Sequence, residues 1–487
     1  MREWRWMAAA CLSGVVSLAA AQIRHAPPRS ATPGGRITIF AAEPGGRTTA
    51  PDAVPLRRLD ASLRGMVRAG AAGGTVSLEA LRNLNPAVHV RLAAPSLTPE
   101  VLVDAVAASD PAAIARALQD LGLRDTARAS NLIGGWLPVT SLGRAAGLTG
   151  LAQVRASMPR TRAAAGPVAL QGDFVQGSSA VRAQYPTLTG QGLTVGVLSD
   201  SFDCYGYYAA NGPSKLGNGY NGYATNTFAA TESTDVSSGA LPSGIDVVEE
   251  ADCANYGAPQ QLPFGDEGRA MAQIIHVVAP AAKLAFHTAS NSEADFAAGI
   301  TQLQKLGANI IVDDVGYPDE PFFQDGVVAQ AVDAAAAQGV AYFSAAGNDW
   351  RNSWESAAPV FLVQGTRRLL NFDVSGATAA TTLALTIPPV SPGDFVLLVV
   401  QWDQPYVTGA PGSPGAANTL NLCIESATPA SDWVAQSNGA AQQVSYPACS
   451  GVNAIGADPV LILAVGNPAN ATSPTLQETL DLSIELV

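Results

Sequence analysis

Between residues 168 and 349 the sequence alternates short apolar runs with longer amphipathic stretches, and this alternation limits the possible folds more than any other feature. Four runs have the length of a strand and few polar residues: LTVGVLSD, AKLAFHTA, ANIIVDDVG and VAYFSAAGN. The stretches between them have helical periodicity, as in EGRAMAQIIHVV and EADFAAGITQLQKLG. A strand that is apolar throughout has to be covered on both faces. The pattern therefore predicts an α/β fold with a parallel sheet flanked by helices.

Three of these apolar runs finish in acids or an amide. Asp200 ends the first run, Asp313 and Asp314 end the third, and Asn348 ends the fourth. In parallel sheets, catalytic and binding groups gather beyond the carboxyl ends of the strands. We therefore expect these four side chains to belong to a functional site.

The flanking regions have different patterns. Residues 81–160 contain a strand–helix–strand pattern repeated twice, which predicts a small α+β domain. Over residues 361–487, apolar runs separated by Gly, Pro and Asn loops predict a β-sandwich. Residues 22–80 are rich in Arg, Ala, Gly and Pro, and we expect a loose leader there.

The N-terminus has the features of a secretory signal. Two arginines precede an apolar run, and small residues precede Gln22, which predicts a signal peptide over residues 1–21. A lipid attachment site at Cys11 is the alternative, but the apolar run before it is short. Because no later segment is long and apolar enough to span a bilayer, we expect a secreted protein, periplasmic or extracellular.

Four cysteines remain beyond Cys11, and they permit three pairings. Their clustering along the chain favours Cys204 with Cys253 and Cys423 with Cys449, in an oxidising compartment. Neither pair has the spacing of zinc ligands and the four histidines are scattered, so we predict no metal site from these residues. The formal net charge of −13 argues against a nucleic-acid partner and says nothing about the oligomeric state.

Three segments resemble those of subtilisin-like serine peptidases. GQGLTVGVLSDSFD resembles the aspartate segment, which matches Asp200 to the acid of the catalytic triad. GVAYFSAAGND resembles the oxyanion segment, in which the amide of Asn348 would stabilise the tetrahedral intermediate. IIVDDVGY resembles the strand that pairs with substrate, so Asp314 and Gly316 are candidate substrate-binding residues, although the family commonly has serine at the position of Asp314.

The resemblance extends upstream, because residues 81–160 resemble the inhibitory propeptide of this family. Residues 161–360 would then form the peptidase core. The resemblance implies a secreted serine-type endopeptidase that acts on proteins or peptides. It requires no cofactor, and calcium is the one candidate ion.

GDEGRAMAQIIHVVAPAAKL aligns with the histidine segment of the family, but Glu267 stands at the position of the histidine. The sedolisins, which share the fold, use Glu as the general base, with an Asp four residues later where this chain has Met271. Glu267, Met271, Ile274 and Val278 are expected to form one buried stripe. Burial and the charge of Asp200 would raise the pKa of Glu267, so the two acids would share a proton and favour an acid-shifted activity optimum. The alternative is an ordinary first-turn Glu favoured by the helix dipole.

Other polar residues nearby have simpler interpretations. Asp266 is expected to be a helix cap or a rim residue, and His276 lies too far along the helix to replace the missing base. His287 is expected to be a residue of a strand. Asp313 and Asp314 are candidates for specificity pockets or a cation site, and a surface loop is the alternative.

A catalytic triad also needs a nucleophile, which this family carries in a Gly-Thr-Ser segment. That tripeptide does not occur in the 487 residues. One interpretation is a truncated product that ends before its serine and is inactive as it stands. A second is a secreted binding or adhesion protein with a catalytically dead peptidase core. A third is a carbohydrate hydrolase that uses Asp200 and Glu267.

Overall fold

The structure is a computed structural model, and all residues that it describes belong to one compact unit, Gly35–Val487. The predicted signal peptide, residues 1–21, and Asn348 lie outside the described residues. The described residues are 37–43, 56–71, 81, 88–93, 98–161, 172–204, 235–253, 265–347, 353–390, 395–428, 434–435, 448–466 and 476–487.

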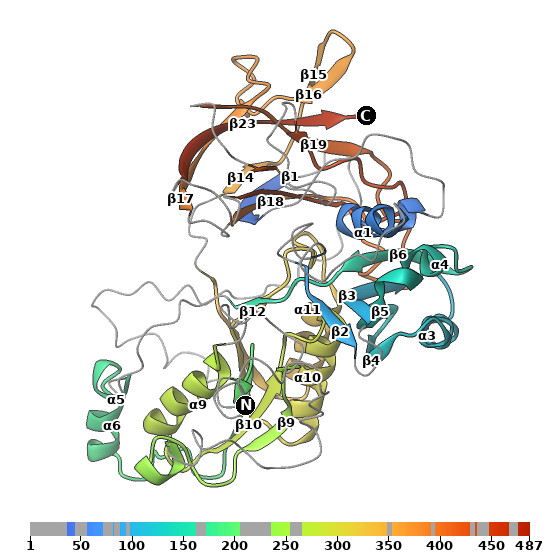
Figure 1. The fold of residues 1–487 in the computed structure, drawn as a ribbon. Coiled ribbons are helices and arrows are strands. Elements are labelled where there is room, and N and C mark those ends of the chain that lie inside the picture. The colour runs from blue at the N-terminus through green and yellow to red at the C-terminus, as the bar shows by residue number, and fades with distance from the viewer. Residues whose placement is uncertain are drawn as a thin grey trace. The chain divides into compact units, whose positions relative to one another are not determined.

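A parallel sheet of five strands occupies the middle of the chain, as the alternating pattern predicts (Figure 1). Its order is β13–β11–β8–β10–β9, and every neighbouring pair is parallel. Because β8 comes first in the chain and later strands lie on both sides of it, its carboxyl end marks a switch point of the topology. The strands are β8 (Thr194–Ser199), β9 (Asp246–Glu249), β10 (Lys283–Thr288), β11 (Ile310–Asp313) and β13 (Ala341–Ser344).

Helices cover both faces of this sheet. Val197 and Leu198 are successive residues of β8, and they contribute to two different hydrophobic cores because successive strand side chains point to opposite faces. One core includes residues of α9, and the other includes residues of α10 and α11. The helices of this region are α5 (Gly172–Val175), α6 (Ser178–Gln184), α9 (Glu267–Val278), α10 (Glu293–Lys305) and α11 (Val327–Ala337).

The buried face of α9 differs from the predicted stripe. Ile274 is 45% exposed, whereas Gly268 and Ala272 are buried and Ile275 packs against the core. A Cβ atom at Gly268 would lie 2.2 Å from Cε2 of Phe286, so this position accepts only glycine at the observed approach of the helix to β10. The expectation about Ile274 was wrong because the apolar residues of α9 fit more than one stripe, and close packing at Gly268 selects the face.

The region of residues 88–156 forms an antiparallel sheet with the strand order β2–β3–β5–β4, in which β6 also pairs with β3. Asp110 accepts hydrogen bonds from the backbone N–H groups of Ala112 and Ala113, and so caps the N-terminus of α3. The elements are β2 (Val90–Ala93), β3 (Thr98–Ala107), α3 (Pro111–Asp120), β4 (Arg124–Ala129), β5 (Leu132–Pro138), η2 (Val139–Ser141), α4 (Leu142–Ala146) and β6 (Leu151–Ala156).

Part of the expected loose leader is ordered secondary structure. β1 (Ile37–Glu43) pairs with β14 and β18 of the C-terminal region. α1 (Ala61–Ala71) follows η1 (Leu56–Arg58). Leu63 and Met66 of α1 are fully buried in the hydrophobic core of the antiparallel sheet of residues 88–156. The composition of residues 22–80 concealed these elements because each is completed by contacts with distant segments.

The C-terminal region consists of two antiparallel sheets that share one hydrophobic core. One has the order β14–β1–β18–β22–β20, and the other has the order β15–β16–β23–β19–β21, with β17 also paired to β23. The strands are β14 (Ser353–Ser356), β15 (Phe361–Gln364), β16 (Arg367–Leu370), β17 (Leu383–Val390), β18 (Phe395–Trp402), β19 (Leu420–Thr428), β20 (Val434–Ala435), β21 (Ala448–Cys449), β22 (Val460–Gly466) and β23 (Leu476–Leu486).

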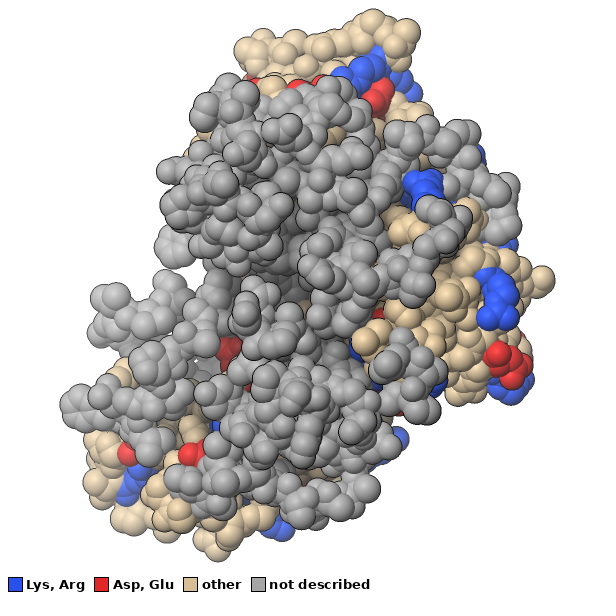
Figure 2. Space-filling model, viewed as in Figure 1, with Lys and Arg blue, Asp and Glu red and all other residues tan. Residues whose placement is uncertain are grey.

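Both predicted disulfides are confirmed. Cys204 is bonded to Cys253, and Cys423 is bonded to Cys449 across the antiparallel pair β19–β21. Within the described residues, no helix is both long and apolar enough to cross a membrane. On the described part of the face drawn in Figure 2, acidic and basic side chains lie beside one another at several places.

A buried arginine connects the three regions. Arg155, on β6, has a side chain that is 3% exposed, and it pairs with Glu293 at the start of α10. Asp319 lies 2.8 Å from Nε of Arg155, and Asp458, just before β22, lies 2.9 Å from Nη1. Asp104 adds a further carboxyl group to the cluster, and burial raises its pKa to about 6. The guanidinium of Arg155 thus interacts with carboxyl groups from all three regions.

Replacing Arg155 with Met is expected to lower the free energy of unfolding at pH 7.5 by about 3–5 kcal/mol, because the buried carboxylates lose their cation. The loss should shrink below about pH 6, where the Asp104 carboxyl becomes neutral. Urea unfolding at the two pH values measures it, with Arg116→Met on the exposed side of α3 as control. An unchanged midpoint for Arg155→Met would show that the cluster does not hold the regions together.

Candidate active site

Asp200 directly follows β8, and its carboxylate receives the first N–H groups of the segment that opens α9. The side chain is buried, and it accepts hydrogen bonds from Gly265 N at 2.6 Å, Glu267 N at 2.9 Å and the backbone of Ser201. These donors stabilise the carboxylate, but burial has the larger effect and raises the pKa of Asp200. Asp200 therefore fixes the end of the helix on which Glu267 lies.

Glu267 is the first residue of α9 and is half-buried, and Asp314 comes directly after β11. Burial, together with the negative charges of Glu267 and Asp200, raises the pKa of Asp314 to about 7. The Ser199 hydroxyl opposes this shift. Within the described residues, however, neither carboxylate oxygen of Asp314 has a hydrogen bond of good geometry. The fold thus brings Asp200, Glu267 and Asp314 into one group of interacting acids, which we call the carboxyl cluster.

Asp313 has a different role from its neighbour. Its carboxylate accepts a hydrogen bond of 2.8 Å from the hydroxyl of Ser344, the last residue of β13. This contact joins two adjacent strands of the parallel sheet at their carboxyl ends.

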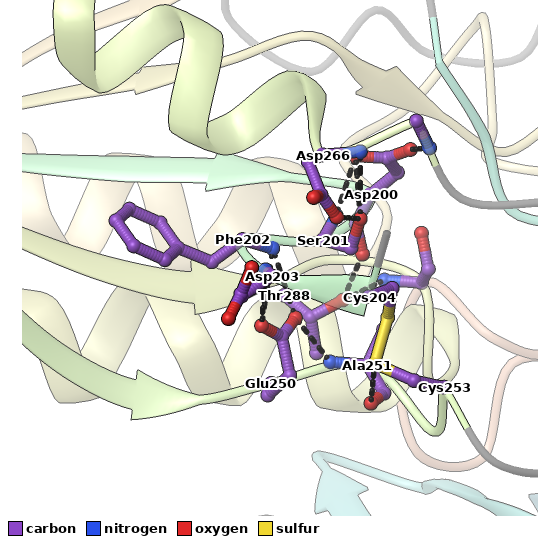
Figure 3. The surroundings of a disulfide bond; sticks show 12 residues. Asp200, Ser201, Phe202, Asp203, Cys204, Glu250, Ala251, Cys253, Asp266 and Thr288 are labelled. Atoms are coloured by element: carbon purple, nitrogen blue, oxygen red, sulfur yellow. Dashed lines mark hydrogen bonds between the residues drawn. A yellow bond between two sulfur atoms is a disulfide. The ribbon is translucent and has the colours of Figure 1, made fainter. Parts of the chain in front are cut away.

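The loop after Asp200 is held by a second set of contacts (Figure 3). Glu250 accepts hydrogen bonds from the backbone N–H groups of Phe202 at 2.9 Å and Asp203 at 2.8 Å. The disulfide between Cys204 and Cys253 closes the loop nearby. Burial raises the pKa of Glu250 to about 8, against the effect of these N–H donors. The disulfide and Glu250 together restrict the backbone that presents Asp200.

Asp266 occupies the N-cap position of α9, but its side chain does not cap the helix. It pairs with Arg269 at 2.9 Å and exchanges hydrogen bonds with the hydroxyl of Ser201. Its backbone has a φ of 53°, in the left-handed region that non-glycine residues seldom adopt. Asp200 accepts the hydrogen bond from Glu267 N, and the Asp266 carboxylate binds Arg269 instead.

A short antiparallel pair lies next to the carboxyl cluster in sequence. β7 (Arg160–Thr161) pairs with β12 (Val315–Gly316), with Thr161 opposite Val315 and Arg160 opposite Gly316. β12 begins one residue after Asp314 and contains Gly316, the predicted substrate-binding residue. The segment that follows β6 therefore pairs with the strand to which the sequence analysis expects substrate to bind.

The structure describes some of the predicted site residues and not others. The structure brings Asp200, Glu267 and Asp314 together, and it places Gly316 on β12. Asn348 lies outside the described residues, so its role as oxyanion donor stays a prediction. The sequence patterns did not reveal Glu250, whose partners are backbone groups that any residue could supply. They also did not reveal β7, because a strand of two residues has no periodicity.

Comparisons with known proteins give little guidance. No protein-family model matches the chain, and no curated protein matches it. Among solved structures, fervidolysin from Fervidobacterium pennivorans, a keratinolytic enzyme related to subtilisin, aligns with a TM-score of 0.26 and 14% identity. The alignment covers 52% of this chain and 40% of fervidolysin, so it spans less than half of that protein. A TM-score of this size carries no argument about function.

Asp314→Asn is expected to stabilise the protein at pH 8 but not at pH 4. In the unfolded chain this carboxyl ionises above its ordinary pKa of 3.8, whereas in the folded chain it ionises only above about 7. Stability is therefore lost as the pH rises from about 4 to about 7, and the amide should restore on the order of 3 kcal/mol at pH 8. Urea midpoints at the two pH values measure the effect.

The matched control for this prediction is Asp120→Asn, on the exposed side of α3. It should change the midpoint equally little at both pH values. If Asp314→Asn behaves like this control, Asp314 is not held in a neutral form by its surroundings.

Proposed function

We propose that the chain is the core of a secreted serine-type endopeptidase of the subtilisin-like and sedolisin-like type. The observation that carries the proposal is the antiparallel pairing of Arg160–Thr161 with Val315–Gly316, directly after Asp314. An extended peptide that adds to a short strand gains backbone hydrogen bonds without regard to its side chains. A peptide bound in this way would lie on the strand that directly follows Asp314.

In this proposal the parts of the fold take the roles that the sequence resemblance implies. The parallel sheet with its helices is the subtilisin-like core, and the antiparallel sheet of residues 81–160 is the propeptide-like domain. The segment at the end of that domain, Arg160–Thr161, pairs with β12 and would keep the enzyme inactive until it is displaced. The two sheets of residues 361–487 form the β-sandwich. The predicted signal peptide and the two disulfides fit an exported protein.

Glu267 acts as the general base. It takes the proton of the serine hydroxyl as the oxygen attacks the peptide carbonyl, and it returns that proton to the amine that leaves. Asp200 orients Glu267 through the N–H group of its first helical residue. Asn348 would donate its amide N–H to the oxyanion. Asp314, neutral below about pH 7, limits the negative charge around Glu267.

The nucleophile is the missing element, since no Gly-Thr-Ser tripeptide occurs in the 487 residues. The same observation favours the second candidate function, a secreted binding protein with a catalytically dead core. The DNA that follows codon 487 distinguishes the two. A Gly-Thr-Ser segment followed by small residues and Pro supports the peptidase, and a stop codon supports the binding role.

The 487-residue chain alone is expected to remain unlabelled by a serine-directed phosphonate. Labelling requires an activated serine beside the base, and the segment that supplies it in this family does not occur in the chain. Intact-mass spectrometry measures the outcome. A stoichiometric mass increase would show that a serine of this chain is the nucleophile and would contradict our assignment.

In the secreted product of the whole gene, Glu267→Gln is expected to lower kcat/KM on a peptide substrate at least about 10³-fold, because the amide cannot accept the serine proton. The activity should have its optimum below pH 7 and fall as Asp314 ionises, and Asp314→Asn should move this alkaline limb upward. Glu355→Gln, at an exposed position of β14, serves as control. An optimum near pH 8–9, or full activity of Glu267→Gln, would reject Glu267 as the base.

A further inference from the structure

A second polar cluster, which shares no residue with the carboxyl cluster, is formed by residues of β9, β10 and α10. It consists of Glu249 at the end of β9, His287 on β10 and Asp295 in the first turn of α10. One ligand atom from each of these side chains lies within 4.8 Å of the other two. The sequence patterns gave no sign of this set, because the three residues belong to separate elements.

The hydrogen bonds of His287 define which ring nitrogen faces the cluster. Nδ1 lies 2.6 Å from the carbonyl oxygen of Thr288, which can only accept, so Nδ1 carries a proton. Nε2 lies 3.4 Å from Oε2 of Glu249 and 3.3 Å from the amide nitrogen of Gln302. A metal-binding histidine commonly donates its second N–H to a backbone carbonyl in this way. Nε2 of His287 is therefore the ring nitrogen that faces Glu249, with the Gln302 amide beside it.

The carboxylates of Glu249 and Asp295 each have one oxygen available to a metal ion at this position. Oε1 of Glu249 accepts a 2.9 Å hydrogen bond from the amide of Asn291, while its Oε2 faces His287. Asp295 is only 6% exposed, and within the described residues its Oδ2 has no hydrogen-bond partner. A buried carboxylate oxygen without a donor is costly, and a cation would satisfy it. This orphaned oxygen is the observation that points to a ligand.

The imidazole of His287 is also held rigidly. It is fully buried, and Gly299 of α10 lies directly behind it. A Cβ atom at Gly299 would lie 2.6 Å from Nδ1 of His287, so the helix can approach the ring only because this residue is glycine. Packing on both sides leaves the ring one orientation, and such preorganisation favours a defined coordination geometry.

We propose that Glu249, His287 and Asp295 form a binding site for a divalent transition-metal ion, best suited to zinc. One imidazole nitrogen and two carboxylate oxygens form a three-ligand set that zinc accepts, with water as fourth ligand. Calcium prefers six to eight oxygen ligands and would find too few here. Two carboxylates with a neutral imidazole carry a charge of −2, which a divalent ion balances. The Glu249 side chain is 21% exposed, so this ligand can be reached from solvent.

The ion would have a structural role. The hydroxyl of Thr288, the residue after His287, donates a 2.7 Å hydrogen bond to the carbonyl oxygen of Asp200. Fixing His287 therefore fixes the end of β10 that supports the backbone of Asp200. This inference is independent of the proposed peptidase function, because the site uses none of the residues of the carboxyl cluster.

Isothermal titration of the chelator-treated full chain with zinc chloride tests the proposal, in a Cys11→Ser background whose remaining four cysteines are those of the two disulfides. We expect one ion per chain with a Kd below about 1 μM, and at least a 100-fold weaker Kd for His287→Gln and for Asp295→Asn. Bound cobalt should give the visible absorption of a four-coordinate ion. His276→Gln, on α9, is the matched histidine control and should bind zinc as the parent does.

Asn291→Ala provides a second variant, since Asn291 donates a hydrogen bond to Glu249 but is not one of the three ligands, and its loss should weaken zinc binding about 10-fold even if the core variants fail to fold. Circular dichroism verifies that each variant is folded. The proposal is overturned if the folded parent chain binds no stoichiometric zinc, if it binds calcium instead, or if Asn291→Ala and the folded ligand variants bind zinc as tightly as the parent.

Discussion

The guanidinium of Arg155 is the contact on which the arrangement of this protein most depends. It lies on the antiparallel sheet and pairs with Glu293 of the α/β region and Asp458 of the C-terminal region, all of them buried. The carboxylates would be expensive to bury alone, so each region needs the cation that another supplies. That mutual need favours a single relative placement of the three regions. It also keeps β6, and with it the nearby β7, beside the strand that follows Asp314.

The carboxyl cluster also depends on buried acids that bind groups from distant segments of the chain. Asp200 is a buried acid whose negative charge is stabilised by the N–H groups that open α9. Through these bonds the end of β8 positions Glu267, and β11 brings Asp314 to the same place. Burial and the negative charges of Glu267, Asp200 and Asp313 raise the pKa of Asp314 to about 7. Groups with pKa values displaced towards neutrality are the kind that catalysis uses.

Local sequence patterns predicted much of the fold. The parallel sheet and its helices were predicted because each strand and helix has its own periodicity, and α9 begins at Glu267 and ends at Val278, the bounds of the helical stretch in the sequence. The two disulfides were predicted because each joins cysteines that are neighbours along the chain. β1, α1 and β9 were missed, since their stability comes from segments far away in sequence. Ile274 was misplaced for the same reason.

The sequence by itself determined four strands of the parallel sheet, β8, β10, β11 and β13, and the helices α9, α10 and α11, and that Asp200, Asp313 and Asp314 lie at strand ends. It also determined that Glu267 begins a helix, because these properties depend on near neighbours in the chain. The tertiary structure alone decided that Asp314 joins Asp200 and Glu267, that Arg160–Thr161 lies on Val315–Gly316, and that His287 faces Glu249 and Asp295. These contacts join groups far apart in sequence, and their energies depend on burial and charge that only the folded chain creates.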